Sequence, residues 1–260
     1  MGEPLDAPVF SALKPLGRVA RLANFRPVGT EPPAIATEDH RAVLVAAWAA
    51  RQQGLFGDDS PLLVRLDAHP DLGEKPRPWA WEQSLLRTVE DVLAVANMQR
   101  PDDGGWACSA MQFGLSRGVA TFFLHDYHRF PGDDGDYTTH DGRDCELWSF
   151  ASIAQFLRRE SRKAARLHAA IERGPVWLDI DLDFATTRDA DGRPLPWTEE
   201  DWRAAFPPGA RAWLAEVVER AALVTIASEP EFCGGWRGVA RVVDGLRKVS
   251  PAGSGIAESL

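Results

Sequence analysis

The chain has 260 residues, of which 45% are hydrophobic and 26% are charged, and these proportions suit one α/β domain with a sizeable core. Its formal net charge of −9 argues against nucleic-acid binding, because a phosphate backbone needs a basic protein face. No apolar run reaches the length of a membrane span, which argues against a membrane protein.

Hydrophobic periodicity and turn residues predict strands and helices that alternate along the chain. Continuous apolar strands between helices are typical of a parallel sheet covered on both faces, so we predict a single α/β domain over residues 1–260. In chain order we expect an irregular proline-rich segment (1–36), a helix (38–53) capped by Thr37, a strand (61–66), a helix (82–98), a turn (101–105), a strand (119–124), an acidic loop (131–144), a helix (148–172), an aspartate-bearing strand (176–184), helices (198–206 and 210–221), a strand (223–227) and a final helix (236–249).

The N-terminus and the cysteines indicate the compartment. Residues 1–4 include no basic residue and no apolar stretch follows them, so we expect no signal peptide. The three cysteines are widely spaced and lack a Cys-x-x-Cys pair, which favours reduced thiols over a zinc–thiolate site. We therefore expect a cytoplasmic protein.

One predicted strand ends in three carboxylates. Asp179, Asp181 and Asp183 alternate with apolar residues, so a strand would place all three on one face. Like charges this close repel each other unless a cation or protons neutralise them. An edge strand with a solvated face is the alternative, but the apolar neighbours of these aspartates do not favour it.

Two other predicted strands also end in polar residues. Asp67, His69 and Asp71 follow the strand at 61–66, and residues 228–231 follow the strand at 223–227. In open α/β sheets ligands bind outside the carboxyl ends of the strands, so these groups are expected at one edge. A polar loop is the alternative for the segment 67–71 taken alone, but the convergence of three groups favours a site.

The residue types indicate a metal centre. Mixed aspartate and histidine ligands suit Mn²⁺ or a similar divalent ion, and two histidines with four aspartates can hold two ions that share carboxylates. His40, near the start of the first helix, is the best second histidine, although a solvated histidine in that turn is the alternative. His125 ends the strand at 119–124, where it is either a proton shuttle or an ordinary core or surface residue.

The order of these motifs resembles the arginase/agmatinase/deacetylase superfamily. Asp39-His40 is similar to the Asp-His segment of that family, and the later motifs are similar to its Asp-Ala-His-x-Asp and Asp-x-Asp ligands. Asp179 falls at a position just outside the metal shell. The resemblance implies a three-layer α/β/α domain with a mainly parallel sheet and two Mn²⁺ ions, with the ligands His40, Asp67, His69, Asp71, Asp181 and Asp183.

Within the superfamily the chain departs from the arginases that act on free arginine. Thr37-Glu38 stands where those enzymes have Gly-Gly, and Phe184-Ala185 replaces an Asp-Pro pair. The segments 178–184 and 225–235 look closer to the peptide arginases, which convert arginine side chains to ornithine during maturation of ribosomally made peptides. The resemblance thus implies an arginine-containing peptide as substrate and leaves the oligomeric state open.

The implied reaction assigns roles to further residues. The leaving amine needs a proton, for which Asp183 and His125 are the candidates. The substrate guanidinium needs an anionic partner, because burying an unpaired charge is costly. Glu231 is the first candidate and Glu229 the second, with a solvent-facing turn as the alternative. Two other functions stay open: hydrolysis of a small guanidino compound or an acylated amine, and a metal-stabilised binding protein without turnover.

Overall fold

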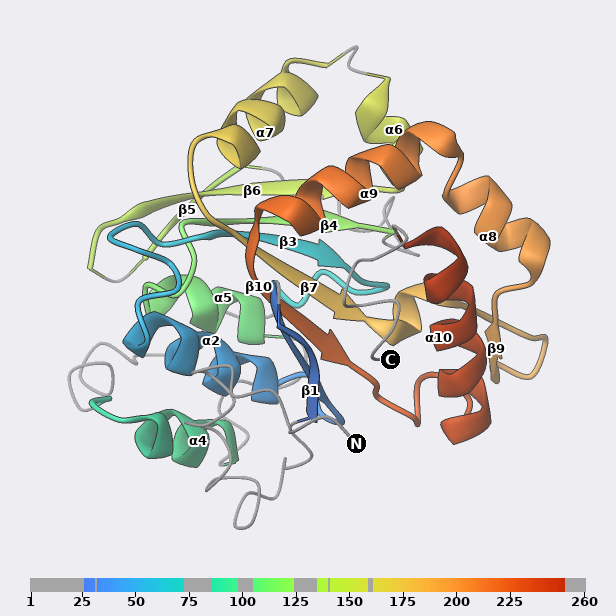
Figure 1. The fold of residues 1–260 in the computed structure, drawn as a ribbon, viewed down its shortest axis with the longest axis horizontal. Helices are drawn as coiled ribbons and strands as arrows, with labels where there is room; N and C mark the ends of the chain where they lie inside the picture. The colour runs from blue at the N-terminus through green and yellow to red at the C-terminus, as the bar shows by residue number, and fades with distance from the viewer. Residues whose placement is uncertain are drawn as a thin grey trace.

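The structure of the protein is a computed structural model that describes residues 26–30, 32–72, 86–97, 105–123, 135–139, 141–158 and 161–250. These residues form three layers, in which a central sheet has helices on both faces (Figure 1). This arrangement confirms the predicted three-layer α/β/α fold. None of the helices in these segments combines the length and hydropathy that a membrane crossing needs.

The described part of the sheet has eight strands in the order β1-β2-β10-β7-β3-β4-β6-β5. The six central strands are parallel, and the edge strands β1 and β5 pair antiparallel with their neighbours. The mainly parallel sheet is therefore as predicted. The strands are β1 (Arg26–Thr30), β2 (Pro33–Thr37), β3 (Leu62–Leu66), β4 (Gly118–Phe122), β5 (Gly135–Thr138), β6 (Asp144–Phe150), β7 (Val176–Asp181) and β10 (Ala221–Ala227), and β8 (Thr186–Arg188) pairs with β9 (Pro194–Pro196) in a separate hairpin.

Alternate side chains of the central strands enter two hydrophobic cores. Leu62 and Val64 of β3 pack in one core, and Leu63 between them packs in the other. Because successive side chains of a strand point to opposite faces, each core lies between the sheet and one helix layer. One layer contains α2 (Ala42–Gln52), α4 (Val89–Asn97) and α5 (Trp106–Gln112), and the other contains α6 (Ile153–Leu157), α7 (Arg162–Glu172), α8 (Glu199–Ala205), α9 (Pro208–Arg220) and α10 (Trp236–Val249) (Figure 1).

The predicted helix at 148–172 is wrong in its first part. Trp148 lies in β6, where it pairs in register with Ala120 of β4, and two separate helices follow. Ser152 accepts a hydrogen bond from the backbone N–H of Gln155 at the start of α6, and Ser161 caps α7 in the same way. Two N-caps therefore divide a segment whose composition reads as one helix.

The start of the first helix also differs from the prediction. Thr37 is the last residue of β2 rather than an N-cap, and α2 begins only at Ala42. His40 therefore lies in the turn between β2 and α2. Helix α5 and strand β5 were not predicted, whereas α10 has the predicted bounds and Thr198 caps α8 with a reciprocal hydrogen-bond pair to Asp201.

Candidate metal centre

The register of the parallel strands brings the predicted ligands to one edge of the sheet. Asp181, at the end of β7, lies beside Ala227 of β10, and Ala227 lies beside Thr37 of β2. On the other side, Ile180 lies beside Leu66, the last residue of β3. The residues that follow β2, β3, β7 and β10 therefore leave the sheet at the same level, which is the convergence that the sequence predicts.

The three aspartates at positions 179, 181 and 183 do not all lie on one strand face. Asp179 and Asp181 are in the strand and share its face with Trp177, which packs in the core on the α2 and α5 side. Asp183 lies in a short 3-10 helix (Leu182–Ala185), so the prediction that it continues the strand is wrong. A carboxylate oxygen of Asp181 accepts a hydrogen bond from the backbone N–H of Asp183 (3.2 Å), and this cap turns Asp183 back toward the site.

His40 is buried between two of these carboxylates. Its Nε2 lies 2.7 Å from Oδ2 of Asp179, and its Nδ1 lies 2.9 Å from Oδ2 of Asp181. The other oxygen of Asp179 accepts a hydrogen bond from the Thr225 hydroxyl (2.6 Å), which itself accepts one from the Trp177 indole N–H (2.8 Å). Such a chain holds an imidazole in one orientation and leaves its second nitrogen for a metal. Asp179 thus contacts His40 on the side opposite Asp181, and its supporting role stays a prediction of the resemblance.

Six residues form what we call the donor cluster. They fall into three sets of three side chains. Within each set, one ligand atom from each residue lies within 4.8 Å of the ligand atoms of the other two, and any two sets have one residue in common. Asp67, Asp181 and Asp183 each belong to two sets, and such sharing is compatible with a metal site of more than one ion. The sets are His40 with Asp67 and Asp181, then Asp67 with His69 and Asp183, and then Asp181 with Asp183 and Glu229.

The two histidines differ in exposure. His40 is buried, whereas the side chain of His69 is 50% exposed and its Nδ1 lies 3.1 Å from Oδ2 of Asp183. The backbone N–H of His69 donates to Asp67 (2.6 Å), which places the imidazole over the edge of the sheet. The His69 side of the cluster therefore faces solvent, and the His40 side faces the interior.

The two glutamates after β10 occupy different environments. Glu229 is partly buried, and its carboxylate accepts a hydrogen bond from the backbone N–H of His40 (3.2 Å). Its own backbone N–H donates to the carbonyl of Glu38 (3.2 Å), and its φ of 31° turns the chain at this point. Glu231 lies two residues further along the turn and is exposed. The structure thus brings the second candidate for the guanidinium partner into the donor cluster.

Asp71, a predicted ligand, belongs to none of the three sets among the described residues. Its Oδ2 accepts hydrogen bonds from the Trp106 indole (2.8 Å) and from Arg65, and lies 3.6 Å from Nδ1 of His40. Arg65 and Trp106 were not predicted as site residues. The sequence did carry one sign of Arg65, since it is the single charge in the apolar strand before Asp67. His125, the predicted proton shuttle, lies outside the described residues.

Burial and mutual repulsion favour protons on the carboxyl groups when no cation is present. Burial, followed by the charge of Asp183, raises the pKa of Asp181 to about 6. Burial, followed by the charge of Asp181, raises the pKa of Glu229 to about 9. Burial acts to lower the pKa of His40, but the carboxylates of Asp179 and Asp181 outweigh it and raise the value. A divalent cation would relieve this repulsion, so the donor set fits Mn²⁺ or a similar ion.

These shifts predict how the metal-free protein responds to pH. The folded state keeps protons on Asp181 and Glu229 that the unfolded chain releases near pH 3.8 and 4.5, so stability is lost as pH rises through about 6 and toward about 9. We expect the melting temperature of chelated protein to fall by several degrees between these two pH values. Added Mn²⁺ should reverse the trend, because it binds deprotonated ligands. Thermal unfolding with and without Mn²⁺ checks this, and a melting temperature of chelated protein that rises with pH would contradict it.

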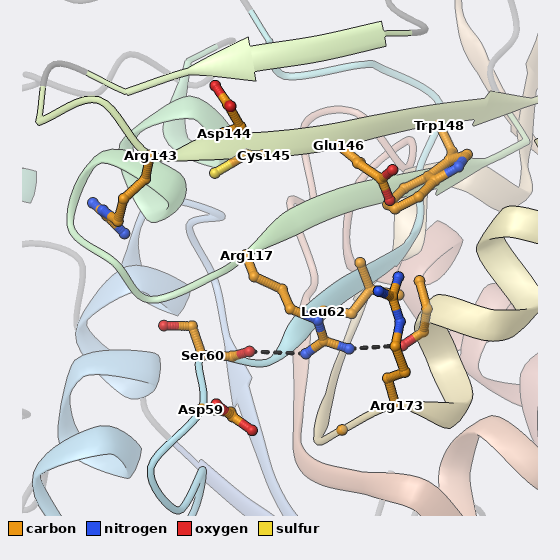
Figure 2. Close-up of a pocket in the computed structure, with 12 residues that line it drawn as sticks. Asp59, Ser60, Leu62, Arg117, Arg143, Asp144, Cys145, Glu146, Trp148 and Arg173 are labelled. Atoms are coloured by element: carbon orange, nitrogen blue, oxygen red, sulfur yellow. Dashed lines mark hydrogen bonds between the residues drawn. The ribbon is translucent and has the colours of Figure 1, made fainter.

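Residues at or just before the starts of β3, β4 and β6 line a cavity of about 640 Å³ (Figure 2), whereas the donor cluster gathers at the other ends of the strands. Arg117, which lines it, donates to the carbonyl oxygens of Ser60 (2.8 Å) and Ala170 (2.7 Å). Burial and the neighbouring charge of Arg173 lower the pKa of this guanidinium. Arg117 therefore ties separate segments together, and no residue of the donor cluster lines the cavity.

The three cysteines, all in the described part of the chain, are buried and form no disulfide.

Comparisons with known proteins give matches only among solved structures. No protein-family model matches the chain, and no curated protein matches it. The chain is similar in structure to proclavaminate amidino hydrolase from Streptomyces clavuligerus, with a TM-score of 0.45, 15% identity and coverage of 87% of this chain and 63% of that enzyme. It thus spans less than two thirds of the length of that enzyme. It is also similar to the arginase of Helicobacter pylori (TM-score 0.43, 11% identity, 93% and 76% covered) and to that of Bacillus cereus (0.40, 15%, 82% and 68%).

Proposed function

We propose that the chain is a dinuclear manganese hydrolase that converts arginine side chains of a peptide to ornithine and releases urea. The observation that carries the proposal is the donor cluster, in which Asp67, Asp181 and Asp183 are each shared between two ligand sets. The motif resemblance supports a guanidino substrate. The segments 178–184 and 225–235 support a peptide.

The chemistry requires a strong nucleophile at neutral pH, because a guanidinium is a poor electrophile. Divalent ions, which His40, Asp67, His69, Asp181 and Asp183 would hold, would supply it by lowering the pKa of a bound water. The protein groups do the remaining work. Glu229 is the member of the donor cluster that would orient the guanidinium, by a charge-assisted hydrogen bond. Asp183 lies next to the half-exposed His69 and would carry the proton that the leaving amine of ornithine takes.

Mass spectrometry of a co-expressed precursor peptide tests the proposed reaction. Each converted arginine loses the elements CN₂H₂, and we expect this loss together with urea in the medium. Free arginine and agmatine, offered at the same concentration, should release no urea. Urea from agmatine but not from any peptide would instead make the protein a hydrolase of small guanidino compounds. Bound metal without hydrolysis of any of these would favour a binding protein.

Metal removal should abolish the activity. We expect chelated protein to lose hydrolysis and Mn²⁺ to restore it better than Zn²⁺, because most ligands in the donor cluster are carboxylate oxygens. The measurement is urea release after dialysis against chelator and addition of each ion. Full restoration by Zn²⁺ with Mn²⁺ inert would contradict the manganese assignment and favour an acylated amine as substrate.

A further inference from the structure

A buried arginine lies against the metal ligands. Arg65 is fully buried in β3, and alternation along the strand puts it on the same face as Asp67. One Nη atom contacts carboxylate oxygens of both Asp67 and Asp71, and the other donates to the carbonyl oxygen of Pro70 (2.8 Å). The guanidinium also lies over the ring of Trp106, with its central carbon 4.7 Å from the ring centroid. A fixed positive charge is thus part of this site.

Arg65 contacts the same carboxylate oxygen atoms that face His40. Nδ1 of His40 lies 3.8 Å from Oδ2 of Asp67 and 3.6 Å from Oδ2 of Asp71, and Arg65 contacts both of these Oδ2 atoms. An ion bound by Nδ1 and these oxygens would therefore have a guanidinium in its immediate surroundings. Two like charges at such a distance repel strongly in a water-excluded site.

The Arg65 side chain is incompletely satisfied. Its Nε is buried, has no hydrogen-bond partner among the described residues, and lies 3.6 Å from Oδ2 of Asp179. An arginine that served only to tie the backbone together would be expected to use all of its donors, because an unmade buried hydrogen bond is costly. Its positive charge is instead surrounded by the carboxylates of Asp67, Asp71 and Asp179, so the site is complementary to the charge of Arg65.

We propose that Arg65 is a built-in counter-ion of the metal centre. In the metal-free protein it neutralises carboxylates that would otherwise repel each other, and so keeps the empty site folded. On the His40 side it competes with the incoming cation for the Oδ2 atoms of Asp67 and Asp71. Arg65 is thus a positioning residue that lowers the affinity for metal there while it stabilises the metal-free state. This inference rests on the proposed metal centre, but not on the substrate.

Two substitutions separate the charge of Arg65 from its packing. Arg65→Met keeps an unbranched side chain against Trp106 and removes the charge, whereas Arg65→Lys keeps the charge and loses the two-carboxylate contact. Calorimetric titration of chelated protein with Mn²⁺ is the measurement. We expect Arg65→Met to bind its weaker ion about ten- to a hundredfold more tightly than the wild type. Substitutions just outside a metal shell usually change affinity by this much, and here the change is a gain because a repelling charge is removed. Arg65→Lys should stay within a few-fold of the wild type.

Thermal unfolding supplies the second readout. Arg65→Met should melt well below the wild type when chelated and close to it when saturated with Mn²⁺. Should the chelated variant fail to fold, refolding in the presence of Mn²⁺ is the decisive step, and rescue by the ion supports the counter-ion role. Failure to fold even with Mn²⁺ would overturn the proposal, because Arg65 would then be needed for the fold in general.

The outcomes also separate this inference from the proposed function. Weaker Mn²⁺ binding by folded Arg65→Met, or unchanged binding, would overturn the counter-ion role and leave the metal centre standing. Wild-type protein that binds no divalent ion at all would overturn the proposed function itself. Trp106→Phe removes the neutral hydrogen bond to Asp71 without changing charge. If it tightens Mn²⁺ binding as much as Arg65→Met does, competition by charge is also refuted.

Discussion

Asp181→Ala is expected to leave the protein without bound metal and without hydrolysis. Asp181 belongs to two of the three ligand sets, and its Oδ2 lies 2.9 Å from Nδ1 of His40. Its removal therefore takes a donor from two sets at once. Two divalent ions contribute several kcal/mol of transition-state stabilisation, so we expect a loss in rate on the order of a thousandfold or more. Metal analysis of protein purified without chelator should fall from close to two ions per chain to almost none.

A matched control is available in the hairpin between β8 and β9. Asp191 is an exposed aspartate there, and Asp191→Ala removes the same side chain from a residue outside the donor cluster. This variant should keep wild-type metal content and activity. Asp181→Ala protein that is folded, retains both ions and still turns over would mean that the donor cluster is not the reactive site.

The second large effect concerns the partner of the substrate guanidinium. Asp181 and Asp183, the other members of the ligand set of Glu229, also belong to sets without it, so Glu229→Gln should retain fold and metal. It should lose most hydrolysis, because a neutral amide cannot offset the positive charge. A hydrogen bond to a charged group contributes roughly 1.5–3 kcal/mol, so kcat/KM should fall by about ten- to a few-hundredfold. The high pKa of Glu229 arises from burial and from Asp181 and Asp183, so cations bound to those aspartates would allow it to ionise.

Glu231→Gln is the natural control, because it makes the same change two residues away on the exposed turn. We expect its kcat/KM to stay within a few-fold of the wild type. The opposite result, with Glu231→Gln severe and Glu229→Gln mild, would restore Glu231, the first candidate from the sequence, as the partner. If both Glu229→Gln and Glu231→Gln change kcat/KM only slightly, the substrate carries no guanidinium. An acylated amine would then be the substrate to test.

The sequence alone determined the type of fold and most members of the donor cluster. Parallel strands end at one edge of a sheet, so acidic groups after the strands at 61–66 and 176–181 had to meet, whatever the loops do. The register confirms this, since Leu66 lies beside Ile180 and Asp181 beside Ala227. These features follow from alternation of side chains and from strand direction, which are local properties.

Long-range contacts decided the rest. Trp148 became part of a strand because β4 offered it a partner in register, although its own segment reads as a helix. Glu229 rather than Glu231 reached the cluster because the chain after β10 turns where the backbone of Glu229 pairs with Glu38. Arg65 is the single charge in its apolar strand, but its places beside Trp106 and Asp179 arise only when α5 and β7 come to lie beside β3. Such pairings depend on residues distant in the chain, so local periodicity carries no record of them.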